Sequence, residues 1–344
     1  MKTKNKFKII TGFNPSDSIN DLKKNAISRI YCGYYDSESE KKWPVAFGCI
    51  NRRGEGVNFY GWNKLSRFAK QAYRENISVY VTLNSHYYIK EQYPWLKKAL
   101  KNINNEPAVT GIIINDLGLL LFLKTINFQK EITISTLATA FNSNAVNFYK
   151  RLGATRIVLD RQMTPDEILD ITSKHPDIDF EIFVLSTGGC LFIDGYCSLF
   201  HCFEQLKNKT AFAKSIKKGQ KYDTTTSGAG CCEVLNCLNA NQFNITENAT
   251  AASKNKISFD ISKTLGFSCN ICMLYKLKNT ANISLKIDNR GSNGSGVTNL
   301  EMLNRLLSAA AVSKNNEEYV KNAKIILKQC KNIKCNSKIC LYGK

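Results

Sequence analysis

The sequence has little histidine, no long hydrophobic run and comparatively few acidic residues. Its histidines are His86, His175 and His201, and it contains neither an H-E-x-x-H nor a G-x-S-x-G motif. These motifs mark zinc hydrolases and α/β-type serine hydrolases, so neither catalytic set is recognisable. No apolar run approaches the roughly 20 residues of a membrane span, and no small-residue cleavage site follows the short apolar stretch near residue 10. We therefore expect a cytoplasmic protein without a membrane span.

The charge of the chain is strongly positive. There are 48 lysines and arginines against 28 aspartates and glutamates, a net charge of +20. Such an excess attracts polyanions over long distances. Lysine is nevertheless spread along the whole sequence, and the only dense basic segment is 207–221. For that segment a solvated surface is the favoured interpretation, with a nucleic-acid groove as the alternative.

Cysteine is rare before residue 190 and frequent after it. Of the 13 cysteines only Cys32 and Cys49 come earlier. The others are Cys190, Cys197, Cys202, Cys231, Cys232, Cys237, Cys269, Cys272, Cys330, Cys335 and Cys340. The cytoplasm keeps thiols reduced, so this concentration indicates metal binding or catalysis rather than disulfides. Four thiolates from distant positions suit an iron-sulfur cluster or a structural zinc, whereas unligated buried cysteines would explain only one or two.

His201 and the cysteines near the C-terminus each have more than one interpretation. His201, beside Cys202, is a weaker ligand candidate than the cysteines, because a lone histidine more often packs. The tail cysteines Cys330, Cys335 and Cys340 recur every five residues. They form either a second metal site or free thiols at a frayed terminus, and we expect Cys335 and Cys340 to lie away from the main metal site.

Short apolar runs alternate with amphipathic helical patterns. The runs that predict strands are 7–13, 28–34, 78–84, 111–116, 132–136, 156–160, 180–185 and 283–288. Near-continuous apolar runs suit parallel strands that are buried on both faces. Thr164, Pro165 and Glu167 form the start signal of a helix between two of the runs. The alternation predicts a TIM-barrel-like (β/α)8 fold of the α/β class, with 132–135 and 156–159 as adjacent parallel strands.

The last two predicted strands are far apart in the sequence. Roughly 100 residues separate them, which is too long for one βα connection and indicates a cysteine-rich insertion. We expect the first seven strands and their helices in 1–200 and the insertion, with a mobile polar loop, in 201–275. The last strand and a C-terminal helix would occupy 276–329, and a cysteine-containing tail 330–344.

Polar residues stand at the ends of most predicted strands. In such a barrel the C-terminal strand ends meet at one mouth, where active sites lie. The residues concerned are Asn84, Asn115, Asp116, Ser135, Thr136, Asp160, Arg161, Lys286, Asp288 and Arg290. Taken together they predict a site. Asp116 and Asp160 have the alternative of capping the helices that follow, and for Asp160 alone that alternative is favoured.

Several stretches, taken in order, resemble peptidase family U32, the collagenase-like proteases. The resemblance runs from about Tyr31 to Arg290, most of the chain. Its longest part is ISTLATAFNSNAVNFYKRLGATRIVLDRQMTPDEI, residues 134–168. The other parts are NRRGEGVNF (51–59), VYVTLN (79–84), the pair Asn115 and Asp116, EIFVLSTGGCLFIDGYC (181–197) and SLKIDNR (284–290).

The resemblance implies a barrel and a particular chemistry. Several family members resemble oxygen-independent hydroxylases of an aromatic ring, either in a quinone precursor or in an RNA base, and they carry a four-cysteine [4Fe-4S] cluster. Carried over by position, the ligands are Cys190, Cys197, Cys232 and Cys269. The alternates are Cys231, Cys237 and Cys272, and zinc is the alternative to the cluster.

The resemblance also implies roles at the mouth. We expect Asp116, Ser135, Arg161 and Lys286 to be catalytic. We expect substrate contacts from Arg52, Asn84, Asn115, Thr136, Asp288 and Arg290, where Arg52, Arg161, Lys286 and Arg290 would hold anionic groups. The chain departs from the family pattern at Ser186 to Gly189, at Gln162, and at Asp288 and Asn289, and these departures bear on any acid–base assignment.

Three functions follow as hypotheses. The first is a cluster-dependent hydroxylase that acts on a small aromatic substrate or on RNA. The second is a peptidase, which would need a metal-bound water or a cysteine nucleophile. The third is a non-catalytic subunit that forms a hetero-dimer with another U32-type protein.

Overall fold

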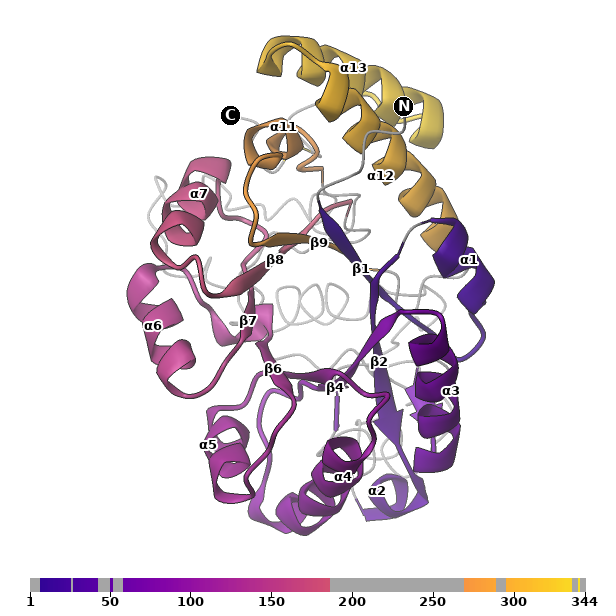
Figure 1. Cartoon of the computed structure of the whole chain (residues 1–344), viewed down its shortest axis with the longest axis vertical. Coiled ribbons are helices and arrows are strands. Elements are labelled where there is room, and N and C mark those ends of the chain that lie inside the picture. The colour runs from indigo at the N-terminus through magenta and orange to yellow at the C-terminus, as the bar shows by residue number, and fades with distance from the viewer. Residues whose placement is uncertain are drawn as a thin grey trace, which may run out of the picture.

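The computed structural model describes residues 7–25, 27–42, 50–51, 58–185, 269–288, 295–335 and 340. Within these ranges, parallel strands close into a barrel, seen along its axis in Figure 1. The barrel strands are β1 (Lys8–Gly12), β2 (Arg29–Tyr35), β4 (Ser78–Leu83), β5 (Gly111–Ile114), β6 (Glu131–Ile134), β7 (Arg156–Val158), β8 (Asp179–Phe183) and β9 (Ile283–Ile287). The ring closes because β1 pairs with both β2 and β9.

The predicted TIM-barrel-like fold is therefore confirmed. Each of the eight expected runs overlaps a barrel strand, and β6 lies parallel to β7 with Thr133 opposite Arg156. One strand was not expected. The short β3 (Asn58–Tyr60) pairs with the C-terminal end of β2, where Tyr34 stands opposite Phe59. It extends the sheet beside β2 at the end where the substrate site was predicted.

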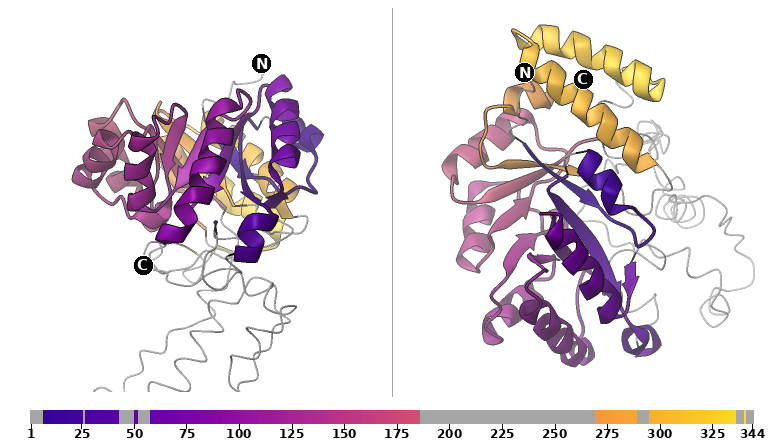
Figure 2. Two further views of the ribbon diagram at one scale, coloured as in Figure 1. Left: turned by 90° about the horizontal axis from the view of Figure 1, so that it is seen from below. Right: turned by 45° about the vertical axis from the view of Figure 1, so that its right-hand side comes forward.

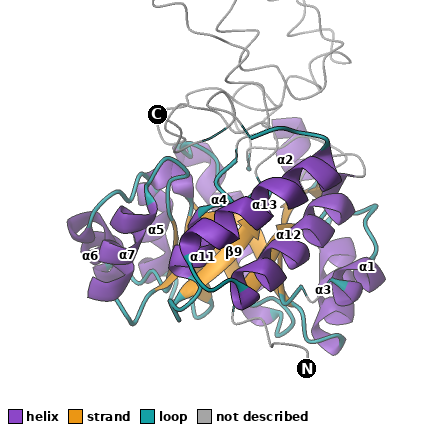
Figure 3. Cartoon of the chain, turned by 90° about the horizontal axis from the view of Figure 1, so that it is seen from above, coloured by secondary structure: helices purple, strands orange, loops and turns teal. Residues whose placement is uncertain are grey.

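Helices surround the strands, as Figure 3 shows from the side. Between the strands lie α1 (Ile19–Lys24), α2 (Ser37–Lys42), α3 (Trp62–Arg74), α4 (Tyr93–Asn105), α5 (Leu117–Thr125), α6 (Ser143–Arg151) and α7 (Pro165–Lys174), with the 3-10 turns η1 (Lys90–Gln92) and η2 (Thr136–Ala138). The start signal at Thr164 is confirmed, because its side chain and that of Glu167 form a capping box at α7.

The C-terminal part of the chain forms more helices than expected. α11 (Met273–Leu277) precedes β9, and α12 (Ser295–Val312) and α13 (Asn316–Lys331) follow it. We expected a single helix after the last strand. The chain instead breaks between α12 and α13, where the Asn315 side chain accepts a hydrogen bond from the Glu318 amide and starts α13. α12 and α13 lie side by side outside β9 and β1 (Figures 1 and 2).

The apolar core has two parts, because alternate residues of a strand point to opposite faces. The larger part fills the space between the barrel wall and the helices. The smaller one consists of Ile10, Tyr31, Tyr80 and Ile113, one residue from each of four strands. Alternation places this second cluster inside the barrel. Among the helices that the structure describes, none has the length and apolar character to cross a membrane.

Candidate functional site

The centre of the barrel holds a buried ion pair. The Nζ atom of Lys286 in β9 lies 2.7 Å from Oε2 of Glu181 in β8. The two side chains are only 5% and 0% exposed. Nε of Arg156 in β7 lies 3.7 Å from the other Glu181 oxygen. Neighbouring strands thus place two cations on one carboxylate in a region shielded from water.

A second charge group lies at the N-terminal ends of the strands. Arg29 in β2 and Arg156 both contact Oδ2 of Asp179, at 3.1 and 3.2 Å. Arg156 also pairs with Glu131 at 3.0 Å, and the Tyr80 hydroxyl donates to the same Glu131 oxygen at 2.8 Å. Active sites of such barrels lie at the opposite end, so this group stabilises the barrel floor.

Cations and aromatic rings meet above the Glu181–Lys286 pair, towards the mouth. The Lys286 ammonium lies 4.2 Å from the centre of the Tyr31 ring and 5.8 Å from that of Phe183. The Arg161 guanidinium lies 4.6 Å from the centre of the Phe183 ring. The Tyr31 hydroxyl faces a carboxylate oxygen of Asp288 at 3.5 Å. The structure therefore brings together Arg161, Lys286 and Asp288, three of the expected site residues.

The arrangement has a clear chemical capacity. Cations held against ring faces in a partly dry space interact more strongly than they do in water. Flat apolar surfaces next to fixed positive charges and one carboxylate suit a planar ring that carries polar or anionic groups. The described part of the mouth is thus suited to an aromatic substrate.

Two asparagines that we assigned to substrate contacts lie at neighbouring strand ends. Asn84 follows β4, and its buried Oδ1 atom has no hydrogen-bond partner among the described residues. Asn115 follows β5, and its amide donates to the carbonyls of Ser85 and His86, both at 3.4 Å. Asn84 therefore retains an acceptor for a ligand, whereas Asn115 orders the loop after β4.

Two residues that we expect to be catalytic also begin helices. Oδ1 of Asp116 accepts a hydrogen bond from the Leu119 amide at 2.6 Å and caps α5. Burial raises the pKa of Asp116. The hydrogen bonds that its carboxylate accepts from backbone amides act in the opposite direction but are outweighed. The Ser135 hydroxyl accepts from the Leu137 amide at 3.4 Å and caps η2, where the buried Thr136 follows. Asp116 thus caps the helix that follows it, as the alternative interpretation of the sequence predicted.

Asp160 also accepts a local hydrogen bond, although it does not cap the next helix. Its Oδ1 atom accepts a hydrogen bond from the backbone amide of Gln162 at 2.9 Å, whereas Thr164 is the residue that caps α7. Several predicted residues lie outside the described ranges. They are Arg52, Cys190, Cys197, Cys231, Cys232, Cys237 and Arg290.

Four of the described thiols, those of Cys269, Cys272, Cys335 and Cys340, lie near one another. Cys269 pairs with Cys340 in an isolated parallel β-bridge. Burial, together with the nearby thiols of Cys272, Cys340 and Cys335, raises the pKa of Cys269 to about 12. Cys335 and Cys340 therefore lie near Cys269, whereas their expected separation from the main metal site stays a prediction, because Cys190, Cys197 and Cys232 fall outside the described ranges. At Cys340 the backbone of the tail pairs with the segment that carries Cys269.

This sulfur-rich position contains one of the expected cluster ligands. In the ranges that the structure describes, no three His, Cys, Asp or Glu side chains are grouped so as to hold a metal ion. Of the proposed ligands, only Cys269 falls in these ranges, and it is 3% exposed. A buried thiol with a raised pKa becomes a thiolate only beside a cation, and soft thiolates suit iron and zinc. Cys269 thus has the chemistry expected of a cluster ligand.

Sequence reasoning missed the residues that organise the mouth from within. Tyr31, Arg156, Glu181 and Phe183 lie inside predicted strands, which we treated as uniformly buried core. A signal was present, since Asp179, Glu181 and Phe183 alternate with apolar residues along one strand. Charged residues at every second position indicate a polar barrel interior.

Comparisons with known proteins extend these observations. The sequence model described as peptidase family U32 matches residues 16–342. A 90-residue segment is 38% identical to tRNA hydroxylation protein P of Haemophilus influenzae and covers 26% of this chain and 19% of that protein. A 94-residue segment is 33% identical to tRNA hydroxylation protein P of Escherichia coli and covers 27% and 20%. The matched segments thus span about a fifth of those relatives.

Among solved structures, the U32 peptidase Mk0906 is similar, with a TM-score of 0.43 and 11% sequence identity. The alignment covers 83% of this chain and 94% of that one.

Proposed function

Because the chain belongs to peptidase family U32, we propose that it hydroxylates a base of tRNA in the cytoplasm, without molecular oxygen and with a [4Fe-4S] cluster. The proposed cluster ligands are Cys190, Cys197, Cys232 and Cys269. The observation that carries the proposal is the group of Arg161, Phe183, Lys286 and Tyr31 at the mouth. Rings flanked by cations suit a nucleobase attached to a phosphate backbone.

The choice of RNA over a quinone precursor rests on two further observations. The curated relatives named above are tRNA hydroxylation proteins, although they match only part of this chain. The net charge of +20 favours a polyanionic substrate. Single bases that are splayed out of an RNA are recognised by aromatic side chains and by arginine planes.

In the proposed reaction the described side chains bind and orient the base. Tyr31 and Phe183 provide flat apolar contacts, and Arg161 attracts the backbone phosphate. Lys286, fixed by Glu181, holds a positive charge where negative charge would build up on the ring. Asp288 accepts a hydrogen bond from a ring substituent. When bound, the cluster would pass electrons or activate an oxygen donor other than molecular oxygen, and that donor would supply the oxygen atom and be reduced by two electrons as the ring is oxidised.

The test uses an Escherichia coli strain that lacks its tRNA hydroxylation protein P. This chain is expressed in that strain without oxygen, and the tRNA nucleosides are analysed by mass spectrometry. We expect a nucleoside that is one oxygen atom heavier, and the anaerobically purified protein should be brown and contain iron and sulfide. Protein that holds zinc and no iron, or tRNA that remains unmodified, would contradict the proposal.

Variants separate catalysis from folding. Lys286→Met and Arg161→Gln should abolish the modification. Lys278→Met is the matched control, because Lys278 also lies over a tyrosine ring, 3.7 Å from the centre of Tyr275, but on the outer helices. Circular dichroism checks that each variant is folded.

Cleavage of a peptide by the wild-type protein, lost in Lys286→Met, would instead favour the peptidase alternative. Modification that appears only with a co-purifying U32 protein would favour the partner-subunit alternative.

A further inference from the structure

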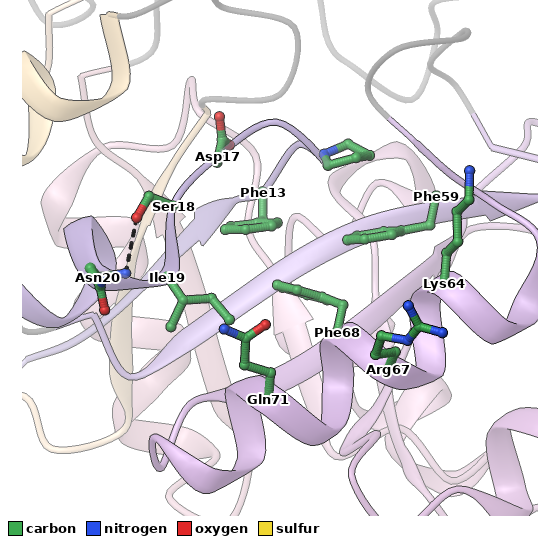
Figure 4. A pocket seen from close by; sticks show the side chains of 11 residues that line it. Phe13, Asp17, Ser18, Ile19, Asn20, Phe59, Lys64, Arg67, Phe68 and Gln71 are labelled. Carbon is green, nitrogen blue, oxygen red and sulfur yellow. Dashed lines mark hydrogen bonds between the residues drawn. The ribbon is translucent and has the colours of Figure 1, made fainter.

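A pocket on the outer side of the barrel lies under the segment between β1 and α1. It has a volume of about 400 Å³ and is lined from three directions, by residues 13–20, by Phe59 of β3 and by α3 (Figure 4). Phe13 follows Gly12 at the end of β1 and joins the outer apolar core, whereas Ile10 joins the inner cluster. The pocket is therefore separate from the barrel interior.

Three phenylalanines form the floor of the pocket. The Phe68 ring lies 4.4 Å from that of Phe13 and 4.7 Å from that of Phe59, measured between ring centres. Phe13 and Phe59 are nearly parallel, at an interplanar angle of 3°. All three are less than a tenth exposed. The floor is thus rigid before any ligand arrives, which lowers the entropy cost of binding.

The rim of the pocket carries two cations. Lys64 and Arg67 are exposed, stand three residues apart on α3 and therefore share one side of the helix. Neither makes an ion pair with a carboxylate of the described residues. Lys70, on the same helix, differs because it pairs with Glu106. α3 itself contains no acidic residue. The positive charge at this rim is therefore available to an anion.

The other side of the rim offers neutral and acidic hydrogen-bonding groups. Asp17, Ser18, Asn20 and Gln71 lie around the aromatic floor, away from Lys64 in Figure 4. The Asp17 carboxylate accepts two hydrogen bonds from Asn14, so its orientation is fixed. Cations on one side and amide and carboxylate groups on the other match the phosphate and the base edge of a nucleotide.

The pocket lies at the mouth end of the barrel. β3 pairs with the last residues of β2, and the Phe13 amide donates to the Tyr31 carbonyl at 2.9 Å. Tyr31 also lines the inner site through its side chain. The stretch of β2 around Tyr31 thus lies between the inner site at the mouth and the outer pocket.

We propose that this pocket binds a second nucleotide of the substrate RNA, next to the one whose base enters the mouth. The inference rests on the proposed function, because it takes tRNA as the substrate. Lys64 and Arg67 hold the phosphate, and the phenylalanine floor receives the base. Such a contact increases affinity and places the RNA strand in register with the mouth.

The test is tRNA binding by the anaerobically purified full-length protein, measured by fluorescence anisotropy at several salt concentrations. Lys64→Glu/Arg67→Glu should weaken binding about tenfold or more and reduce the slope of log affinity against log salt by about one, because both side chains are placed on one phosphate. The matched control is Lys97→Glu/Lys101→Glu on α4. It makes the same change in net charge at exposed lysines that line no described pocket, and it should stay within about twofold of wild type.

The outcomes separate the two proposals. If wild-type protein binds no tRNA, the proposed function fails and this inference fails with it. If wild-type protein binds tRNA but the two double variants weaken binding equally, only the pocket assignment is overturned, because general charge then explains the effect. A free mononucleotide that binds to wild-type protein as tightly as tRNA does, and that the α3 variant loses, also overturns it, since the pocket would then hold a cofactor.

Discussion

At the scale of single residues, Glu181 is a buried carboxylate on which two cations depend. It is fully buried, and its carboxylate faces Lys286 and Arg156 at once. Removing one member of a buried ion pair leaves the other charges without compensation, which costs more than the pair itself contributes. The same carboxylate holds the ammonium that we place against the substrate ring. A change at Glu181 is therefore expected to lower the stability of the fold and also to displace the Lys286 ammonium from the proposed substrate site.

We expect Glu181→Gln to lower the free energy of unfolding by about 3–5 kcal/mol. Urea denaturation followed by circular dichroism measures this loss. The matched control is Glu38→Gln, because Glu38 also faces two cations, Lys42 at 2.9 Å and Lys98 at 3.4 Å, but is 36% exposed. That variant should change stability by no more than about 1 kcal/mol. Equal losses in the two variants would show that burial of the Glu181 pair does not matter.

At the scale of elements, the start of α5 decides between two roles of Asp116. A serine at this position can still accept the hydrogen bond from the Leu119 amide, whereas alanine cannot. If Asp116 acts only as a cap, Asp116→Ala should cost about 1 kcal/mol of stability, and Asp116→Ser should cost less and keep hydroxylation. Urea denaturation and the tRNA nucleoside assay measure the two effects. Loss of hydroxylation in a stable Asp116→Ser protein would support the catalytic assignment that the sequence predicted.

The C-terminal tail is the second element whose placement is testable. Cys269 is 3% exposed, and its backbone pairs with that of Cys340. In protein prepared without the cluster, removal of residues 332–344 should therefore speed alkylation of Cys269 by iodoacetamide about tenfold or more, since a protected thiol becomes accessible. Mass spectrometry of peptides follows the reaction, with the fully buried Cys32 of β2 as the internal reference.

Cys340→Ser is the control for this truncation. The bridge to Cys269 is made by backbone atoms, so the serine variant should protect Cys269 as well as wild type does. Unchanged Cys269 reactivity in the truncated protein would mean that the tail does not cover it.

At the scale of the whole molecule, charges on the floor of the barrel link strands that are distant in the sequence. Asp179 of β8 contacts Arg29 of β2 and Arg156 of β7. Burial acts to raise the pKa of Asp179, but the two guanidinium groups outweigh it and hold the pKa below its usual value. A lowered pKa in the folded state means that unfolded chains take up the proton first. The stabilisation is therefore complete above about pH 5 and is lost as pH falls below about 4.

Asp179→Asn should thus be less stable than wild type at neutral pH, and the difference should shrink as the solution is made acidic. Urea midpoints measured between about pH 7 and pH 3 follow the difference. Asp170→Asn serves as the control, because Asp170 pairs with Lys174 on the exposed face of α7. It should show a small difference throughout. A gap for Asp179→Asn that stays constant with pH would contradict the assignment.

The sequence was informative where local rules apply. Apolar runs located all eight barrel strands, and the Thr164 and Glu167 pair located the start of α7, because propensity and capping act over a few residues. The short β3 was missed, since three residues carry no periodic pattern. The site was predicted in part: Arg161, Lys286 and Asp288 do come together. Asp116 and Ser135 were assigned to catalysis although each caps a helix.

By itself, then, the sequence determined the order of strands and helices, the excess of positive charge and the membership of peptidase family U32. These properties depend on neighbouring residues or on motifs that can be read along the chain. Only the tertiary structure decided which residues of each strand face the interior, that Glu181 holds Lys286, and that Cys340 lies beside Cys269. Closure of the barrel and the return of the tail bring together residues that are far apart in the chain, and no local pattern specifies such contacts.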